Sequence, residues 1–322
     1  MNAARLSVIL LSADGGASLK AVLRRLSTLG SAGELEIVAA IPPGQSLVID
    51  PSPCFAGFRV VHAPLTEDIG KGRGAAIRAA TAPFVVLGED HSFPAEGWPQ
   101  ALLVALENGA AGAGPQMRVA NPETSISWSE VILCYGAYLQ PQRLDHAASV
   151  PWHNSAFRRD ALLELGDRLD FLLQADSALM AALASRGHRF ALTPDAATEH
   201  CNTSQLWPCW FGLFWGNRLY GANRATSENW PLLRRLFYAL CWPAIVALRF
   251  GRGVRVCCSL HDRRVRLSGV VPLLVGGSMV AASGEAWGYL AGLGRRTLRR
   301  RAHYELNRVR YVRASEMILF EE

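Results

Sequence analysis

The sequence lacks closely paired cysteines and the pattern of a secretion signal, and each absence argues against a class of protein. Its seven cysteines include no C-x-x-C pair, so neither a disulfide framework nor a zinc site is indicated. The amino terminus lacks the cationic, apolar and small-residue regions of a signal peptide and leads directly into an apolar strand. We therefore expect the catalytic part of the chain to be cytoplasmic, with reduced thiols.

Lysine is almost absent, because Lys20 and Lys71 are the only two in 322 residues, and arginine therefore carries most of the net charge of +6. Half of the residues are hydrophobic and 19% are charged, which excludes a disordered tail. The mean hydropathy is positive, which favours contact with a membrane. Gly70, Gly72 and Gly74 lack the spacing of either common phosphate-binding glycine loop, so none is expected there.

Apolar runs of strand length alternate with segments of helical periodicity through the first hundred residues. The predicted strands cover 5–11, 35–41, 57–63 and 84–88, and the predicted helices cover 19–30, 72–82 and 96–108. Such alternation predicts an α/β fold with a mostly parallel sheet and helices on both faces. Ligands of such sheets bind beyond the carboxyl ends of the strands, where Asp14 and the 89–91 triplet fall.

The alternation loosens between residues 115 and 200. We expect a helix over 125–139, a short extended piece leading into a helix within 154–166, a helix ending at Gly187, a strand over 188–192 and then a loop. After residue 200 the composition shifts toward Trp, Phe and Arg. We therefore predict two domains, 1–205 and 206–322.

The run "VVLGEDH" ends a buried strand on Glu89, Asp90 and His91. Two acids beside an imidazole repel one another or compete for protons unless solvent or a cation separates them. In an extended segment Glu89 and His91 point the same way and can hold one ion. A carboxylate with an imidazole suits Mn²⁺ better than Mg²⁺, which prefers oxygen ligands. The alternative is a solvated loop or a helix cap.

Five segments between residues 5 and about 200 resemble, in order, the family 2 glycosyltransferases with the GT-A fold. The segments are "SVILLSAD", "GKGRGAAIRAATA", "FVVLGEDH", "NSAFRRDALLELG" and "LLQADSALMAALASRGHRFALTPDAATEH". The resemblance implies a Rossmann-like GT-A domain and a nucleotide-diphosphate sugar donor. Glu89-Asp90-His91 stands where the family has the Asp-x-Asp metal motif, which implies a subfamily with Mn²⁺ (or Mg²⁺) as cofactor.

The resemblance also implies roles for single residues. Asp176 stands at the position of the general base, which would deprotonate an acceptor hydroxyl and give inversion. The metal ligands would be Glu89 and His91, with His200 as a late ligand. Ser12, Asp14, Gly70, Arg73 and Asp90 are the expected donor-binding residues.

Several positions depart from the family pattern. Asp14 replaces Asn in the first loop, Gly74 replaces Asn after Arg73, and Ala175 precedes the base where the family often has Glu. The second strand ends on Ala39-Ala40-Ile41 instead of the Asp that usually holds the base of the nucleotide. The identity of the nucleotide is therefore open.

The carboxyl-terminal third combines aromatic, apolar and basic residues in a way that suits a membrane interface. Residues 236–248 are apolar over too short a run to span a bilayer, and 268–294 are long enough but contain Pro272 and Glu285. Arginine clusters follow both segments, so crossing by both segments or by the second alone would place one cluster outside, against the positive-inside tendency. We expect helices lying in the cytoplasmic leaflet or a re-entrant hairpin, attracted by anionic lipid; a crossing helix and a soluble appendage are the alternatives.

These observations predict a membrane-associated, metal-dependent, inverting glycosyltransferase at the cytoplasmic face of the cell membrane. Its acceptor would be a lipid-linked or cell-surface glycan. Binding of nucleic acid is not expected, because apolar residues interleave the basic clusters. Two alternatives remain: a nucleotidyl or phosphoryl transferase, and a catalytically silent, membrane-bound scaffold or sugar-binding relative.

Overall fold

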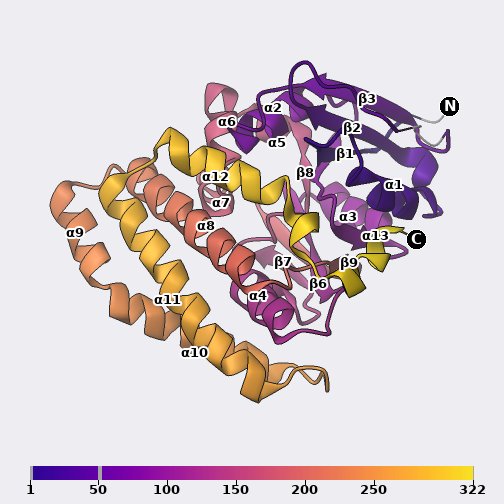
Figure 1. Cartoon of the computed structure of the whole chain (residues 1–322). Helices are drawn as coiled ribbons and strands as arrows, with labels where there is room; N and C mark the ends of the chain where they lie inside the picture. Colours follow the sequence, from indigo (N-terminus) through magenta and orange to yellow (C-terminus); the bar gives the residue numbers. More distant parts are fainter. Residues whose placement is uncertain (1–2, 50–52, 322) are drawn as a thin grey trace. The chain divides into compact units, whose positions relative to one another are not determined.

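Strand β1 (Leu6–Leu11) lies within a sheet whose first half is parallel. The computed structural model describes residues 3–49 and 53–321, without the side chain of Asp176. Strands β2 (Leu35–Ile41) and β4 (Phe84–Leu87) flank β1, and β3 (Gly57–His62) pairs with β2, all in parallel. These four strands are the four predicted from the apolar runs, and β1, β2 and β3 are labelled in Figure 1.

The second half of the sheet contains antiparallel pairs, of β8 with both β4 and β6 and of β9 with both β5 and β7, so the sheet as a whole is mixed. The strand order is β3-β2-β1-β4-β8-β6-β9-β5, with β7 paired to β9. The additional strands are β5 (Ser92–Pro94), β6 (Gly112–Val119), β7 (Leu144–Ala147), β8 (Ala156–Arg158) and β9 (Phe190–His200). The segment 193–200, expected to be a loop, is strand, because it pairs with β5.

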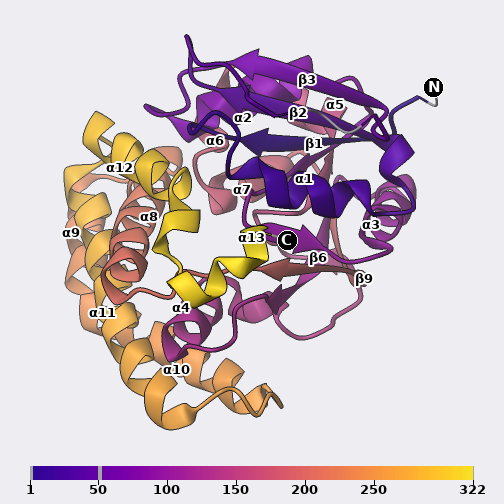
Figure 2. The ribbon, with the colours of Figure 1, turned by 45° about the vertical axis from the view of Figure 1, so that its right-hand side comes forward.

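Helices cover both faces of the sheet, as the alternation predicts. Leu6, Val8 and Leu10 of β1 pack in one core with α1 (Leu19–Ser27) and α3 (Trp98–Glu107). Helix α2 (Ile69–Ala79) packs against β1, β2 and β3. Figure 2 shows α1 in front of the sheet. Helix α2 begins three residues before the predicted start, because the Asp68 side chain accepts a hydrogen bond from the Gly70 N–H at 2.9 Å.

Short helices complete this part of the chain. They are α5 (Arg159–Leu163), α6 (Leu169–Leu172), α7 (Asp176–Ala184) and α13 (Ile318–Glu321), with 3₁₀ turns at Ala32–Glu34 and Gly166–Arg168. Helix α13 packs against α1, and Phe320 contacts Phe93 with ring centroids 5.7 Å apart. The end of the described chain therefore belongs with the sheet.

A second group of helices forms a bundle around α11. Its members are α4 (Ser125–Tyr135), α8 (Leu206–Ser227), α9 (Leu232–Leu240), α10 (Trp242–Ser259), α11 (Leu267–Ala291) and α12 (Arg295–Glu305), with 3₁₀ turns at Gly136–Tyr138, Arg308–Tyr311 and Ala314–Glu316. Side chains larger than glycine at 284 and 288 of α11 would clash with the backbone of α8, so the two helices pack closely. Among the described residues, α11 is the one helix long and apolar enough to cross a membrane.

The chain divides into two compact units, and their boundaries differ from the predicted domains. The first unit holds residues 1–118, 140–200 and 317–322, and the second holds 119–139 and 201–316. The predicted boundary near residue 205 lies close to the division after His200. Residues 119–139 nevertheless join the second unit, because α4 packs against α10 and α11.

Candidate metal and donor site

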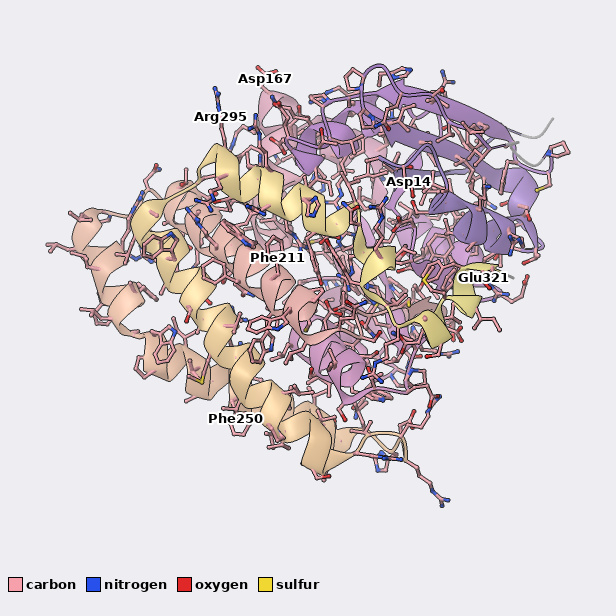
Figure 3. The ribbon with its side chains drawn as sticks, viewed as in Figure 1. Asp14, Asp167, Phe211, Phe250, Arg295 and Glu321 are labelled. Atoms are coloured by element: carbon pink, nitrogen blue, oxygen red, sulfur yellow. The ribbon has the colours of Figure 1, made fainter. Side chains whose placement is uncertain are left out.

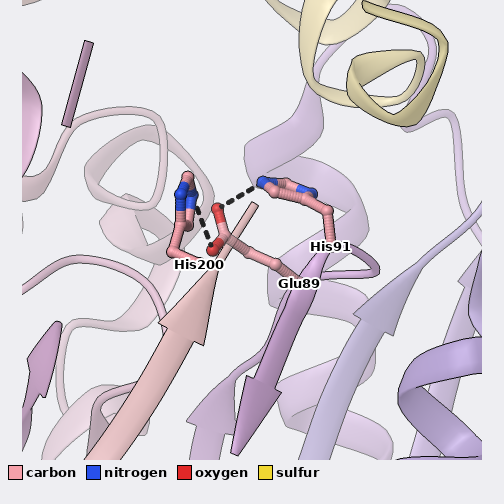
Figure 4. Close-up of side chains that lie close together, drawn as sticks. All are labelled: Glu89, His91 and His200. Atoms are coloured by element: carbon pink, nitrogen blue, oxygen red, sulfur yellow. Dashed lines mark ion pairs between the residues drawn. The ribbon is translucent and has the colours of Figure 1, made fainter. Parts of the chain in front are cut away.

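The site lies where β4 ends, within the first unit. A turn after β4 carries Glu89, Asp90 and His91 and leads directly into β5. Strand β5 pairs antiparallel with β9, which aligns His200 with Ser92. The sheet therefore brings His200 beside residues that precede it by more than one hundred positions (Figure 4).

Glu89, His91 and His200 form a cluster that has the dimensions of a metal site. Glu89 Oε1 lies 3.4 Å from His91 Nε2, and Glu89 Oε2 lies 3.5 Å from His200 Nε2. Their ligand atoms all lie within 4.8 Å of one another, and all three residues are buried. The segment is a turn and not the extended piece assumed from the sequence, but the side chains converge as predicted.

Asp90 orients His91. Its Oδ1 lies 2.7 Å from His91 Nδ1, and Asp90 is itself buried. A proton held on Nδ1 by this carboxylate leaves Nε2, which faces Glu89, with its lone pair available. The structure thus places Asp90 next to the imidazole, while its predicted part in donor binding stays a prediction.

Two residues that sequence reasoning missed, His153 and Asn154, also contact Glu89. His153 Nδ1 lies 3.1 Å from Glu89 Oε1, and Asn154 Nδ2 donates to Glu89 Oε2 at 3.0 Å. Asn154 is buried and has a φ of 62°, a conformation that is uncommon for a residue other than glycine. Its backbone N–H donates to the Leu87 carbonyl at 2.8 Å, which fixes it beside the end of β4. The only signal in the sequence was that Asn154 opens the family-like segment "NSAFRRDALLELG" and His153 directly precedes it.

The neighbours of Glu89 favour the ionised form of its buried carboxylate. Burial raises the pKa of Glu89, but the positive charge of His153, His91 and His200 more than offsets this and lowers it well below its ordinary value. Oε2 accepts hydrogen bonds from Ser92 Oγ at 2.7 Å and from Asn154. Among the described residues, the buried Oε1 accepts no hydrogen bond. A buried carboxylate oxygen in this state, facing imidazole nitrogens, fits a divalent cation.

Arg73 links this cluster to the segment that precedes α7. The buried guanidinium lies 3.5 Å from His153 Nδ1, donates to the Leu173 carbonyl at 3.4 Å and stacks over Trp152 at 5.1 Å. Asp176 follows Leu173 by three positions and begins α7. The side chain of Asp176 lies outside the described part of the structure, and its role as the base stays a prediction.

Ser12 and Asp14 hold the loop after β1. Ser12 Oγ donates to Asp14 Oδ1 at 2.8 Å, and the two Asp14 oxygens accept from the N–H groups of Gly16 and Ser18 at 3.1 and 3.0 Å. Asp14, labelled in Figure 3, is exposed. These bonds give both residues a local role in shaping the loop, whereas their expected contact with the donor stays a prediction.

Gly70 and Gly74 are explained by packing between α2 and α6. A Cβ at Gly70 would lie 2.2 Å from the Asp170 carbonyl oxygen, and one at Gly74 would lie 1.9 Å from Asp170 Oδ1. Gln174 Nε2 also donates to Asp68 Oδ2 at 2.8 Å. The contact of Gly70 with the donor stays a prediction. Glycine is required at this position because α6 packs too closely for a larger side chain.

The family model described as Glycosyl transferase family 2 matches residues 54–166, about a third of the chain. The matched segment contains β4, the Glu89–His91 turn and His153, and it ends before Asp176 and His200. No curated protein matches the chain.

Several solved structures are similar over most of the chain. TarS 1-349 from S. aureus is 14% identical, with a TM-score of 0.43, over 88% of this chain and 89% of that one. The longer TarS chain has the same identity and TM-score, but the match spans 54% of it. PcManGT from Pyrobaculum calidifontis, described as a mannosyltransferase in complex with GDP-Man and Mn2+, is 14% identical, with a TM-score of 0.47, over 95% of this chain and 86% of that one. At these values the likenesses carry no conclusion about activity.

Proposed function

We propose that this protein is a glycosyltransferase that uses a nucleotide-diphosphate sugar as its donor. The observation that carries the proposal is the buried Glu89 carboxylate, which faces imidazoles at the carboxyl end of β4 inside the segment that matches the family model. Open sheets bind ligands at this edge. We extend the proposal to the GT-A subfamily with Glu-Asp-His in place of Asp-x-Asp.

Glu89, His91 and His200 are the proposed metal ligands. Two imidazole nitrogens with one carboxylate favour Mn²⁺ over Mg²⁺, which prefers an all-oxygen shell. A bound divalent cation supplies neutralisation of the charge that develops on the departing diphosphate. Asp90 keeps His91 Nε2 turned toward the site, and Asn154 and Ser92 hold Glu89 Oε2 in place.

Asp176 is the proposed general base. It would take the proton of an acceptor hydroxyl as that oxygen attacks the anomeric carbon opposite the leaving diphosphate, which inverts the anomeric centre. The position of its backbone supports this role, because Arg73 bonds Leu173 just before α7 and contacts His153 next to Glu89. Arg73 also places a positive charge where a diphosphate would benefit from it.

The proposed acceptor is a lipid-linked or cell-surface glycan, and the proposed location is the cytoplasmic face of the cell membrane. Support comes from the second unit, where large apolar side chains of α9 are exposed. A membrane-bound acceptor would meet the enzyme at such a surface.

A screen of nucleotide sugars tests the donor. The purified chain with Mn²⁺ should gain thermal stability with one donor class, since a ligand at about 100 times its dissociation constant adds about 2.7 kcal/mol to the free energy of unfolding. The Glu89→Gln variant should lose the response. Product analysis should find a nucleoside diphosphate.

Release of pyrophosphate would instead identify a nucleotidyl transferase. Absence of any response to Mn²⁺ and every nucleotide diphosphate would favour a catalytically silent scaffold. The end of β2 supports that alternative. Ala39 and Ala40 are buried there, in place of an acid that would bind the base of the nucleotide.

A further inference from the structure

Helix α9, in the second unit, carries its apolar side chains on the outside. The helix has nine residues, and its exposed side chains include Leu232, Leu233, Leu236, Phe237 and Leu240, with exposed fractions between 40% and 80%. With 3.6 residues per turn these positions fall on one arc of the helix. A helix of a soluble unit normally turns this arc inward.

The opposite face of α9 is fixed against the bundle, so the outward orientation is not an effect of loose packing. Tyr238 stacks on Trp230 with ring centroids 4.5 Å apart, and Trp230 stacks on Tyr289 of α11 at 5.1 Å. The guanidinium of Arg234 lies 4.3 Å from the centroid of the Trp230 ring. The aromatic contacts therefore hold α9 with its leucines facing away from the bundle.

Helix α10 continues the surface and changes it from apolar to basic. Its exposed positions Ala244, Ala247 and Leu248 are followed, at helical spacing, by exposed Arg252 and Arg255. The turn after α10 adds exposed Arg263 and Arg266. Between residues 229 and 284 the single acid is Asp262, which pairs with Arg264 at 2.6 Å.

These arginines lack acidic partners in the part of the unit that the structure describes. Among the residues that the structure describes, Arg252, Arg255, Arg263 and Arg266 take part in no ion pair. The surface therefore joins an apolar arc to a cluster of uncompensated positive charge. Its charge complement is an anionic surface that also accepts apolar side chains.

Helix α11 has the buried polar contacts and close helix packing of a bundle interior, which do not suit a helix surrounded by lipid. Its Glu285 is buried, pairs with Arg249 of α10 at 2.6 Å and accepts from Tyr289 at 2.5 Å. Gly284 and Gly288 face backbone atoms of α8. Helix α9 is about 14 Å long at about 1.5 Å per residue, too short to cross a hydrocarbon core of about 30 Å.

We propose that α9 and the first turns of α10 lie in the plane of an anionic lipid bilayer. The leucines of α9 and Phe237 enter the region between headgroups and acyl chains, and Arg252, Arg255, Arg263 and Arg266 contact the headgroups. This mode of binding needs no crossing helix. It concerns the second unit alone and does not depend on the transferase activity.

Flotation of the full chain with vesicles tests the proposal. The protein should float with phosphatidylcholine vesicles that contain phosphatidylglycerol, bind pure phosphatidylcholine more weakly and be released by alkaline carbonate. Replacing both Leu233 and Leu240 with Ser should weaken binding about tenfold or more, since each loses buried apolar area. The matched control replaces the exposed Val48 and Val104 of the first unit with Ser, and its binding should be unchanged.

The arginines are tested separately. Arg252→Gln with Arg255→Gln should weaken binding to the anionic vesicles about tenfold or more and reduce its dependence on salt. All replaced side chains are exposed, so circular dichroism and the melting temperature should stay at the wild-type values and show that the variants fold.

Three results would overturn the proposal. Failure of the wild type to float with anionic vesicles would show that the surface does not bind lipid. Resistance to carbonate would show a spanning segment. A wild-type dimer that the two leucine substitutions convert to a monomer would show that a second copy covers α9.

Discussion

Two buried glutamates, one in each unit, have different kinds of neighbour around their carboxylate oxygens. Glu130 of α4 accepts four hydrogen bonds: Oε1 accepts from Tyr304 at 2.7 Å and Arg308 at 3.2 Å, and Oε2 accepts from the backbone and hydroxyl of Thr203 at 2.6 and 2.5 Å. Glu89 accepts from Ser92 and Asn154 on Oε2, and three imidazoles lie within 3.5 Å of its two oxygens.

Under the proposed function, the difference separates a structural carboxylate from a carboxylate that holds a metal ion. The donors of Glu130 are fixed in place, and burial raises the pKa of Tyr304 well above its ordinary value, so its hydroxyl stays a donor. The imidazoles beside Glu89 can instead offer nitrogen lone pairs to a metal ion. Burial alone does not distinguish the two sites, but the kind of neighbour does.

The largest effect is expected for Glu89→Gln. Loss of one metal ligand should lower the rate of sugar transfer by about 10²- to 10⁴-fold, since a metal contributes several kcal/mol to a transition state. Glutamine keeps the shape of the side chain and an acceptor oxygen for Ser92 and Asn154, so the metal-free variant should lose less unfolding free energy than Glu130→Ala does. Wild-type activity in this variant would remove Glu89 from the site.

Glu130→Ala should show the reverse pattern. It removes the carboxylate that pairs with buried Arg308, and breaking a buried pair in this way costs about 3–5 kcal/mol of unfolding free energy. Urea unfolding measures the loss, and titration with Mn²⁺ should find the wild-type affinity in the protein that remains folded. A large loss of Mn²⁺ affinity would contradict the division of roles between the two glutamates.

The sequence predicts those elements that are determined by their own residues, and it misses those that depend on contacts with distant segments. Strands β1 to β4 are apolar runs bounded by turn residues and were predicted, as was the convergence of Glu89 and His91. The strand over 193–200 was missed because Pro194, Asp195 and Glu199 weaken the pattern and its pairing with β5 is a tertiary contact.

The missed site residues have the same explanation. His153 and Asn154 reach Glu89 from about sixty positions away, through the pairing of β8 with β4, and nothing near them in the sequence marks that contact. Asp14 and Gly70 were assigned to the donor by resemblance, whereas the structure also gives them local roles that sequence spacing does not reveal.

Asn154 gives a further test of the comparison, because it holds Glu89 in place by a hydrogen bond but is not itself a proposed metal ligand. Asn154→Gly should lower Mn²⁺ affinity by about 10- to 100-fold, the usual effect of losing a residue that holds a ligand. Asn154→Ala should lower it similarly but destabilise the fold more, because glycine adopts the φ of 62° without strain. Equal stability of the two variants would show that the backbone conformation costs nothing. Unchanged affinity in both would exclude a supporting role.

Tyr304→Phe is expected to have the smallest effect. It removes one of four hydrogen bonds to Glu130, which corresponds to about 1 kcal/mol of unfolding free energy. Tyr311→Phe is the control, since its hydroxyl contacts His303 at 3.4 Å in an exposed position and makes no contact with Glu130 among the described residues. Urea unfolding should separate the two variants, and an equal loss in both would show that the Glu130 network adds little.

The central claim is that Glu89, His91 and His200 together bind a divalent cation. Anomalous diffraction from a crystal of the full chain soaked in Mn²⁺ tests it most directly. The account predicts one strong peak within about 2–2.5 Å of Glu89 Oε and the Nε2 atoms of His91 and His200. A crystal that binds Mn²⁺ elsewhere, with no peak beside Glu89, would contradict it.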